Sequence, residues 1–108
     1  MAKVEIDESL KNEILRKFKQ ESKTIFRQMQ SLEENPHKGK TLGEVGGIVI
    51  KEIKYKSFRF YFITDGYKLR IMEQSKLTDL LIRFVRMSNK KDQQKTINEI
   101  KKVLIHFG

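Results

Sequence analysis

The feature that most constrains the fold is a run of period-two alternation in the middle of the chain, GGIVIKEIKYKSFRFYFITDGYKLRI, residues 46–71. Lysines and arginines alternate there with aromatic and β-branched residues, which favour strands. Because successive side chains of a strand point to opposite faces, the segment predicts one apolar face and one basic, aromatic face. Asp65-Gly66 predicts a tight hairpin turn, since both positions tolerate positive φ. The basic face is a candidate phosphate-binding surface.

Helical spacing precedes this segment. Residues 3–6 alternate and predict a short edge strand, after which Asp7 or Ser9 is expected to cap a helix. An amphipathic helix or helical hairpin is expected to run to about Glu34, where Asn35-Pro36 stops it. The period slips across residues 19–22, so one bent helix and two helices both fit. The apolar face consists of Leu10, Ile14, Phe18, Ile25, Met29 and Leu32.

The remaining elements follow from the change of period. Glycines 39, 43, 46 and 47 indicate a loop. Residues 48–56 predict a strand and residues 57–64 its continuation or a second strand, with the side chains of Phe58, Phe60 and Phe62 on one face. Strands at 67–72 and 80–85 are expected around a polar turn at 74–76. A final helix at about 91–105 presents Ile97, Ile100, Val103 and Leu104 on one face.

This order predicts an α+β fold in one domain of residues 1–108. An N-terminal helix or helical hairpin is expected to pack on a small antiparallel sheet, with a C-terminal helix.

The positive charge is concentrated in the second half of the chain. Residues 1–50 hold 9 Lys/Arg and 8 Asp/Glu, whereas residues 51–108 hold 14 and 6, so the halves carry net charges of +1 and +8. Clustered bases are typical of proteins with a polyanionic partner, such as nucleic acid, an acidic protein or a membrane surface. Basic residues that serve only solubility are the simpler reading of the same charge.

Composition also excludes several kinds of site. The chain has no cysteine and only 2 histidines, so disulfides and thiolate chemistry are excluded, and no metal or other cofactor is expected. No apolar stretch is long enough to span a membrane, and the N-terminus lacks the apolar core of a signal peptide. We therefore expect a cytoplasmic protein without a membrane partner.

Two segments resemble the RelE/ParE toxin superfamily of toxin–antitoxin systems. The phrase SLEENPHKGKTL, which closes a helix and leads into a strand, is followed by KSFRFYFITDG. The later segment IRFVRMSNKKDQQKTINEIKK is similar to the HigB-related branch, in which a strand runs into lysines and then a helix. The resemblance spans roughly residues 10–104 and rests on the order of these short motifs.

The resemblance implies a type II toxin, a ribosome-associated endoribonuclease that cuts mRNA and is held inactive by a cognate antitoxin. Arg59 matches the arginine of the family's aromatic-arginine-aromatic strand, and Arg86 is the best match for a second arginine. Lys51, Lys54 and Lys56 match its basic strand. The chain departs from several members in having no tyrosine near its C-terminus.

Metal-free RNA cleavage requires a base for the 2′-hydroxyl, stabilisation of the phosphorane's negative charge and protonation of the leaving 5′-oxygen. Arginine suits the second role because its planar fork donates two hydrogen bonds to phosphate oxygens. Arg59 and Arg86 are the candidates, whereas Arg83 is expected on the opposite face. A lysine acts as a base where burial or nearby cations favour its neutral form, and Lys54 is the candidate.

The remaining basic and aromatic residues of this surface are candidates for binding RNA. They are Lys51, Lys56, Tyr61, Lys90 and Lys91. Tyr61 is expected to stack on a base, and the lysines to contact the phosphate backbone. Tyr61 also has a structural reading, as a half-buried tyrosine of the sheet. Lys51, Lys54 and Lys56 have another, as lysines that only coat a sheet face and grip the phosphate backbone.

Two alternatives to an endoribonuclease remain. A protein of the same fold can poison another target, as gyrase is poisoned in the ParE branch, or it can bind nucleic acid without cutting it.

Overall fold

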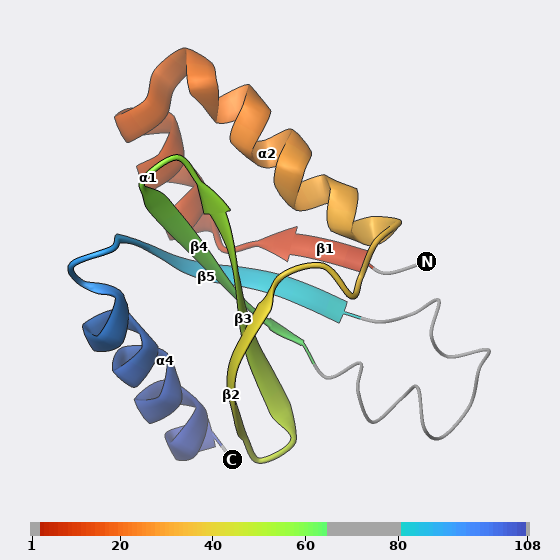
Figure 1. Cartoon of the computed structure of the whole chain (residues 1–108), viewed down its shortest axis with the longest axis vertical. Coiled ribbons are helices and arrows are strands. Elements are labelled where there is room, and N and C mark those ends of the chain that lie inside the picture. The colour runs from red at the N-terminus through yellow and green to blue at the C-terminus, as the bar shows by residue number, and fades with distance from the viewer. Residues whose placement is uncertain (1–2, 65–80, 108) are drawn as a thin grey trace.

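The computed structural model describes residues 3–64 and 81–107. The elements, which Figure 1 labels, are β1 (Lys3–Ile6), α1 (Glu8–Phe18), α2 (Ser22–Gln30), β2 (Lys40–Val45), β3 (Ile48–Tyr55), β4 (Phe58–Thr64), β5 (Leu81–Asn89) and α4 (Gln93–Phe107). The expected turn at Asp65-Gly66, the strand at 67–72, the turn at 74–76 and the first residue of the strand at 80–85 lie outside the described residues.

The strands in the described part of the chain form one five-stranded sheet of order β1-β5-β4-β3-β2. β1 lies at the edge, as its short alternating sequence predicts, and the α+β class is confirmed. The sheet is mixed rather than antiparallel, because β1 pairs with β5 in parallel while the other neighbours are antiparallel. Alternation within each strand could not reveal this pairing, because it joins residues 3–6 to residues 81–84, which are far apart in the sequence.

The helical segment before Asn35 is broken in two. Short 3₁₀ turns at Lys19–Glu21 and Ser31–Glu33 follow α1 and α2. The first of them coincides with the slip in the apolar period, and Lys19 there has φ of +49°. Ser22, which is buried, donates its hydroxyl to the Ile14 carbonyl at 3.1 Å. The hydrogen bond ties the first turn of α2 to α1.

The glycine-rich segment contains a strand, so the expectation of a loop over residues 39–47 is wrong. β2 pairs with β3, and Gly46 and Gly47 form the two-residue turn between them with φ of +58° and +89°. Positive φ at both positions is what such hairpin turns require, and glycine adopts it without strain. The glycines therefore shape a hairpin rather than end the sheet.

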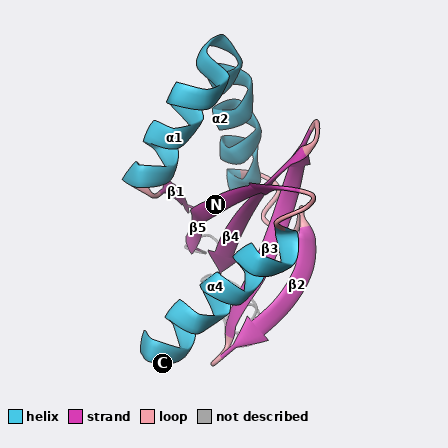
Figure 2. Cartoon of the chain, turned by 90° about the vertical axis from the view of Figure 1, so that its left-hand side faces the viewer, coloured by secondary structure: helices cyan, strands magenta, loops and turns pink. Residues whose placement is uncertain are grey.

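The two faces of the sheet carry separate apolar clusters. One face packs against α1 and α2 and includes Phe60, Phe62 and Phe84, all fully buried. The other face packs against α4 through Ile50, Tyr61, Ile97 and Ile100. The helices therefore lie on opposite sides of the strands (Figure 2). On α4, Val103 is 43% exposed, so the apolar face expected from spacing is only partly covered.

Asp7 lies just before α1, as expected for a cap, but its side chain makes no capping hydrogen bond. Its carboxylate instead accepts two hydrogen bonds from Arg83, at 2.8 and 2.6 Å. This contact raises the pKa of Arg83, mainly through the hydrogen bond to Asp7. Asp7 therefore links the start of α1 to β5. A prediction from local sequence could not include this contact, because Arg83 is far from Asp7 in the chain.

Candidate nucleic-acid interface

The sheet face toward α4 contains an ion pair that is almost completely buried. Glu52 on β3 and Arg59 on β4 approach with 3.7 Å between Glu52 Oε2 and Arg59 Nε. Their side chains are 1% and 10% exposed. Period-two alternation puts both on the face of Ile50, which packs against α4. Arg59 is thus held by a carboxylate within the protein rather than exposed on the surface.

Polar residues from β4, β5 and α4 surround the pair. Ser88 Oγ lies 2.9 Å from the Asn89 carbonyl and 2.7 Å from the Tyr61 hydroxyl. Either hydroxyl can be the donor in the contact between Tyr61 and Ser88. Gln93, the first residue of α4, donates from Nε2 to Glu52 Oε2 at 3.3 Å. We call Glu52, Arg59, Tyr61, Ser88 and Gln93 the polar cluster.

Tyr61 is fully buried within this cluster, so its ring is not available to stack on a base in this conformation. Burial raises the pKa of Tyr61, outweighing the hydrogen bond with Ser88, which lowers it. The hydroxyl therefore stays protonated near neutral pH.

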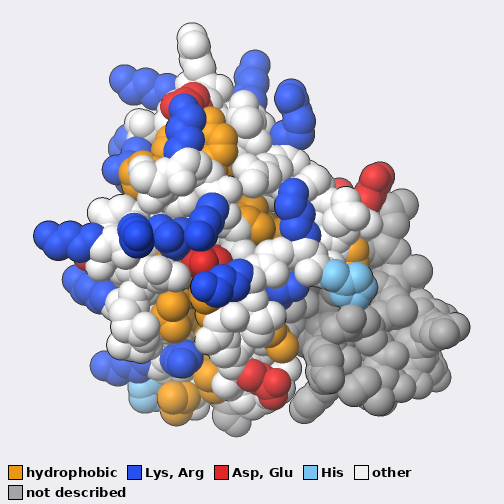
Figure 3. Space-filling model, in the orientation of Figure 1, with side chains coloured by type: hydrophobic (Ala, Val, Ile, Leu, Met, Phe, Trp, Pro, Cys, Tyr) orange, Lys and Arg blue, Asp and Glu red, His pale blue; other side chains and the backbone are white. Residues whose placement is uncertain are grey.

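Lys54 lies at the exposed margin of the polar cluster. It is directly opposite Arg59 in the β3–β4 register, so the two cationic side chains share a face of the sheet. Lys90 and Lys91 are exposed in the turn between β5 and α4. Figure 3 shows Lys and Arg side chains gathered in a band that crosses the strands from this turn. Three of the candidate lysines thus remain accessible near Arg59.

The other two lysines of the basic strand lie elsewhere. Lys51 has the opposite parity to Lys54 and lies on the α1–α2 face, where it is buried, donates to the His37 carbonyl at 3.2 Å and lies over the Phe62 ring. Lys56, in the β3–β4 turn with φ of +54°, pairs with Glu21. The basic strand is therefore divided among two faces and a turn.

Arg83 and Arg86 share one face, so the expectation that they lie on opposite faces is wrong. The register pairs Ile63 with Arg83 and Tyr61 with Arg86, and the one-residue shift between these pairs is a β-bulge. Directly opposed residues point to the same side, and Ile63 and Tyr61 both face α4. Arg86 therefore lies diagonally across from Arg59, one alternation along β5 from Ser88.

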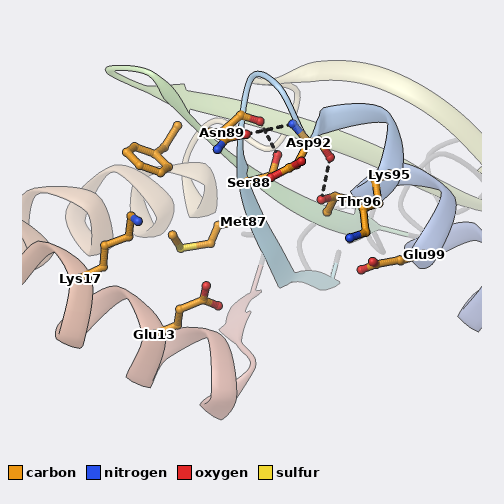
Figure 4. Close-up of a pocket in the computed structure, with 10 residues that line it drawn as sticks. Glu13, Lys17, Met87, Ser88, Asn89, Asp92, Lys95, Thr96 and Glu99 are labelled. Atoms are coloured by element: carbon orange, nitrogen blue, oxygen red, sulfur yellow. Dashed lines mark hydrogen bonds between the residues drawn. The ribbon is translucent and has the colours of Figure 1, made fainter.

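A hollow of about 250 Å³ adjoins the polar cluster at Ser88. Figure 4 shows Glu13 and Lys17 on α1 across from Lys95 and Glu99 on α4, with Met87 of β5 between the helices. β1 pairs only with residues 81–84, so β5 has no strand partner on this side from Val85 to Asn89 in the described part of the chain. The hollow lies over this open edge and carries charges of both signs.

Two other features bear on what the site could hold. Among residues 3–64 and 81–107, no group of three or more His, Cys, Asp or Glu side chains is placed to hold a metal ion. No helix in the same part of the chain is long and apolar enough to cross a membrane.

Sequence reasoning overlooked three members of the polar cluster, Glu52, Ser88 and Gln93. Only Glu52 had a usable signal, because it is two residues from Lys54 and therefore on the same strand face. Ser88 and Gln93 join the cluster through the bulge and the packing of α4, neither of which local patterns encode.

The fold and the site define an α+β protein with a mixed sheet, five-stranded over residues 3–64 and 81–107, whose α4 face combines exposed lysines with a buried arginine–glutamate pair. Comparisons of the chain with protein-family models, with curated proteins and with solved structures found no match.

Proposed function

We propose that this protein binds RNA through the α4 face of its sheet and cleaves mRNA there without a metal, as a RelE- or HigB-like toxin of a type II toxin–antitoxin system. The observation that carries the proposal is the position of Lys54 directly opposite Arg59, with Lys90 and Lys91 exposed nearby. Clustered cations of this kind neutralise consecutive phosphates of an RNA backbone. Cognate antitoxin, mRNA and the ribosome are the proposed partners.

Each proposed role follows from side-chain chemistry. The neutral form of Lys54, which is exposed directly opposite Arg59, takes the proton of the 2′-hydroxyl, and the leaving 5′-oxygen takes a proton from water. Arg59, joined by Arg86 across the sheet, stabilises the charge that develops on the phosphorane oxygens. Lys90 and Lys91 hold the flanking phosphates, because they are exposed at the end of β5.

The second candidate is binding of RNA without cleavage. It is favoured by one observation, that Arg59 is engaged by Glu52 and is only 10% exposed. A protein of this kind needs only Lys54, Lys90 and Lys91, which already reach solvent. Poisoning of gyrase, as in the ParE branch, has no comparable support. The exposed lysines favour a polyanion such as nucleic acid, and no observation favours gyrase in particular.

The decisive experiment is to incubate the purified protein with translating ribosomes and mRNA and to map the new RNA ends. Attack by the 2′-hydroxyl leaves a 2′,3′-cyclic phosphate or 3′-phosphate and a 5′-hydroxyl, and 2′-deoxyribose at the cut site should block it. EDTA should not stop cleavage of free RNA, which is tested in parallel because the ribosome itself needs magnesium. Cleavage that survives the deoxy substitution would overturn the mechanism.

Variants assign the cleavage to this site. We expect Lys54→Ala to reduce cleavage by about 10²–10⁴-fold if it is the base, and Arg59→Lys by about 10²–10³-fold. Lys23→Ala, which removes an exposed charge from α2, is the matched control and should cleave like the parent protein. RNA that is bound with salt-dependent affinity but never cut would favour the binding protein instead.

A further inference from the structure

The ion pair in the polar cluster leaves two buried atoms without hydrogen-bond partners among the described residues. They are Glu52 Oε1 and Arg59 Nε. The 3.7 Å separation between Arg59 Nε and Glu52 Oε2 is too long for a hydrogen bond. Buried charged groups normally have all their polar atoms hydrogen-bonded. A buried polar atom without a partner loses its contact with water and gains no hydrogen bond in exchange, which destabilises the protein. The closed arrangement of this pair is therefore incompletely compensated.

The first turn of α4 covers the pair and is held by polar contacts. Gln93 reaches Glu52 at 3.3 Å, and the turn before it is fixed by the Asp92 backbone N–H, which donates to Asn89 Oδ1 at 2.9 Å. The apolar residues that bury α4 against the sheet, Ile97 and Ile100, begin farther along the helix. Within the first turn, Gln93 is half-buried and the next two residues are exposed, whereas Thr96 is buried. Residues 93–95 can thus separate from the sheet while the helix from Thr96 onward stays packed.

We infer that Glu52 occupies the position of an RNA phosphate on Arg59, and that the first turn of α4 is a lid that must open before RNA reaches this arginine. The inference rests on the proposed function, in which Arg59 binds phosphate. Glu52 is an internal anion beside the guanidinium, as a phosphate oxygen would be. The free protein is therefore autoinhibited at Arg59, whereas Lys54 remains exposed.

The physical chemistry favours an exchange of this kind. Opening the lid hydrates the two atoms that lack partners, which offsets part of the loss of the Gln93 contact. An incoming phosphate can form two parallel hydrogen bonds with Arg59, whereas Glu52 approaches it at 3.7 Å. Phosphate and Glu52 repel each other, so binding of one displaces the other.

The test measures the affinity of the whole protein for a short single-stranded RNA. Glu52→Gln keeps the side-chain shape and removes its charge, and we expect at least about tenfold tighter binding. Glu44→Gln, which removes one exposed carboxylate from β2, is the control for net charge and should change affinity less than about twofold. Adding Arg59→Lys to Glu52→Gln should abolish the gain, because the gain acts through Arg59. Where the parent protein binds RNA, an equal gain from Glu44→Gln, or none from Glu52→Gln, would overturn the inference.

A second variant guards against misfolding of Glu52→Gln. Gln93→Ala leaves the ion pair intact and removes the lid's contact, so RNA should bind about two- to fivefold tighter and the amide hydrogens of the first turn of α4 should exchange faster. If Glu52→Gln is unfolded by circular dichroism, Gln93→Ala decides the question, and unchanged affinity and exchange in it would refute the lid.

A readout without RNA separates this inference from the proposed function. In ¹⁵N NMR spectra the Arg59 Nε–H signal should exchange faster in Glu52→Gln than in the parent protein, and only the variant should respond to inorganic phosphate. If no variant binds RNA but Arg59 behaves in this way, the lid stands and the RNA function fails. If Glu52→Gln does not change the exchange of the Arg59 Nε–H signal and phosphate does not shift that signal, the lid is refuted, irrespective of the RNA-binding results.

Discussion

At the scale of single residues, Arg59 has two roles to reconcile. It is the best candidate for contacting phosphate, yet its side chain is 10% exposed and pairs with a carboxylate that is 1% exposed. A sequence alone suggests an exposed strand arginine whose removal leaves the fold intact. Its burial changes that expectation, because removing one partner of a buried pair leaves the other charge uncompensated.

We predict that Arg59→Ala lowers the free energy of unfolding by about 3 kcal/mol, the low end for breaking a buried pair because the contact is long. The double variant Arg59→Ala, Glu52→Ala should lose less than the sum of the two single variants. Urea denaturation measures all three. A stable Arg59→Ala protein would mean that Glu52 is hydrated and that the pair contributes little.

Gly39 is a second residue whose identity the fold requires. Its φ is +105°, and an added Cβ would lie 3.0 Å from the Glu52 carbonyl oxygen and 3.0 Å from the Phe62 ring. We predict that Gly39→Ala destabilises the protein by about 2–3 kcal/mol through backbone strain and overpacking. Gly46→Ala, with φ of +58° and nothing within 4 Å of the added Cβ, should cost about 1 kcal/mol. Equal losses in thermal or urea unfolding would show that crowding at Gly39 is relieved.

At the scale of elements, α1 and α2 are attached to the sheet through one apolar cluster. Leu10, Ile14, Ile25 and Met29 of the two helices join Phe60 in it. The helical spacing of the first four and the strand alternation around Phe60 predicted this set, since each period exposes one apolar face.

Phe60→Ala tests this packing. Phe60 is fully buried, so we predict a loss of about 3–5 kcal/mol in the free energy of unfolding. Leu15→Ala, on the outer side of α1 and 46% exposed, is the control and should change stability by less than about 1 kcal/mol. A melting temperature unaffected by Phe60→Ala would refute the assignment of the core.

Another contact joins the break between α1 and α2 to the β3–β4 turn. Glu21 accepts hydrogen bonds from Lys56 and from the Tyr55 hydroxyl, the latter at 3.0 Å. The hydrogen bond from Lys56, followed by that from Tyr55, holds the pKa of Glu21 below its ordinary value. An exposed contact of this kind contributes little to the free energy of unfolding, but its effect on the titration of Glu21 is measurable.

We predict that NMR titration finds the pKa of Glu21 below that of an unperturbed glutamate and that Lys56→Ala raises it. Because the folded-state pKa is depressed, the stability contributed by this contact is present above the unfolded-state value and disappears as the pH falls through the folded-state value. Glu33→Gln, which alters a glutamate of the second 3₁₀ turn, should leave the Glu21 titration unchanged. If the pKa of Glu21 is the same in Lys56→Ala as in the parent protein, the pair between Glu21 and Lys56 does not form in solution.

At the scale of the whole molecule, the net charge of +9 is carried almost entirely by residues 51–108. Such a field attracts any polyanion at long range and makes association sensitive to salt. The proposed antitoxin should therefore be acidic or should displace α4, which covers the polar cluster.

We predict that log K for single-stranded RNA falls with log salt with a slope of about −3, from four phosphate contacts at about 0.7 each. The four groups are Lys54, Arg59, Lys90 and Lys91. Replacing Lys90 and Lys91 by Ala should reduce the slope to about −1.4, whereas Lys11→Ala with Lys23→Ala, which lowers the net charge equally, should leave it near −3. Affinity that does not vary with salt would point to apolar docking instead.

The sequence by itself determined the α+β class, the edge position of β1 and the phenylalanine stripe that faces α1 and α2. These follow from periods of 2 and 3.6, which depend only on the geometry of each element. Tertiary structure decided the rest. The parallel pairing of β1 with β5 and the competition of Arg83 for Asp7 join residues far apart in the chain. The bulge that brings Arg86 to the face of Arg59, and the lid that α4 forms over Glu52, arise from register and packing, which no local pattern of residues contains.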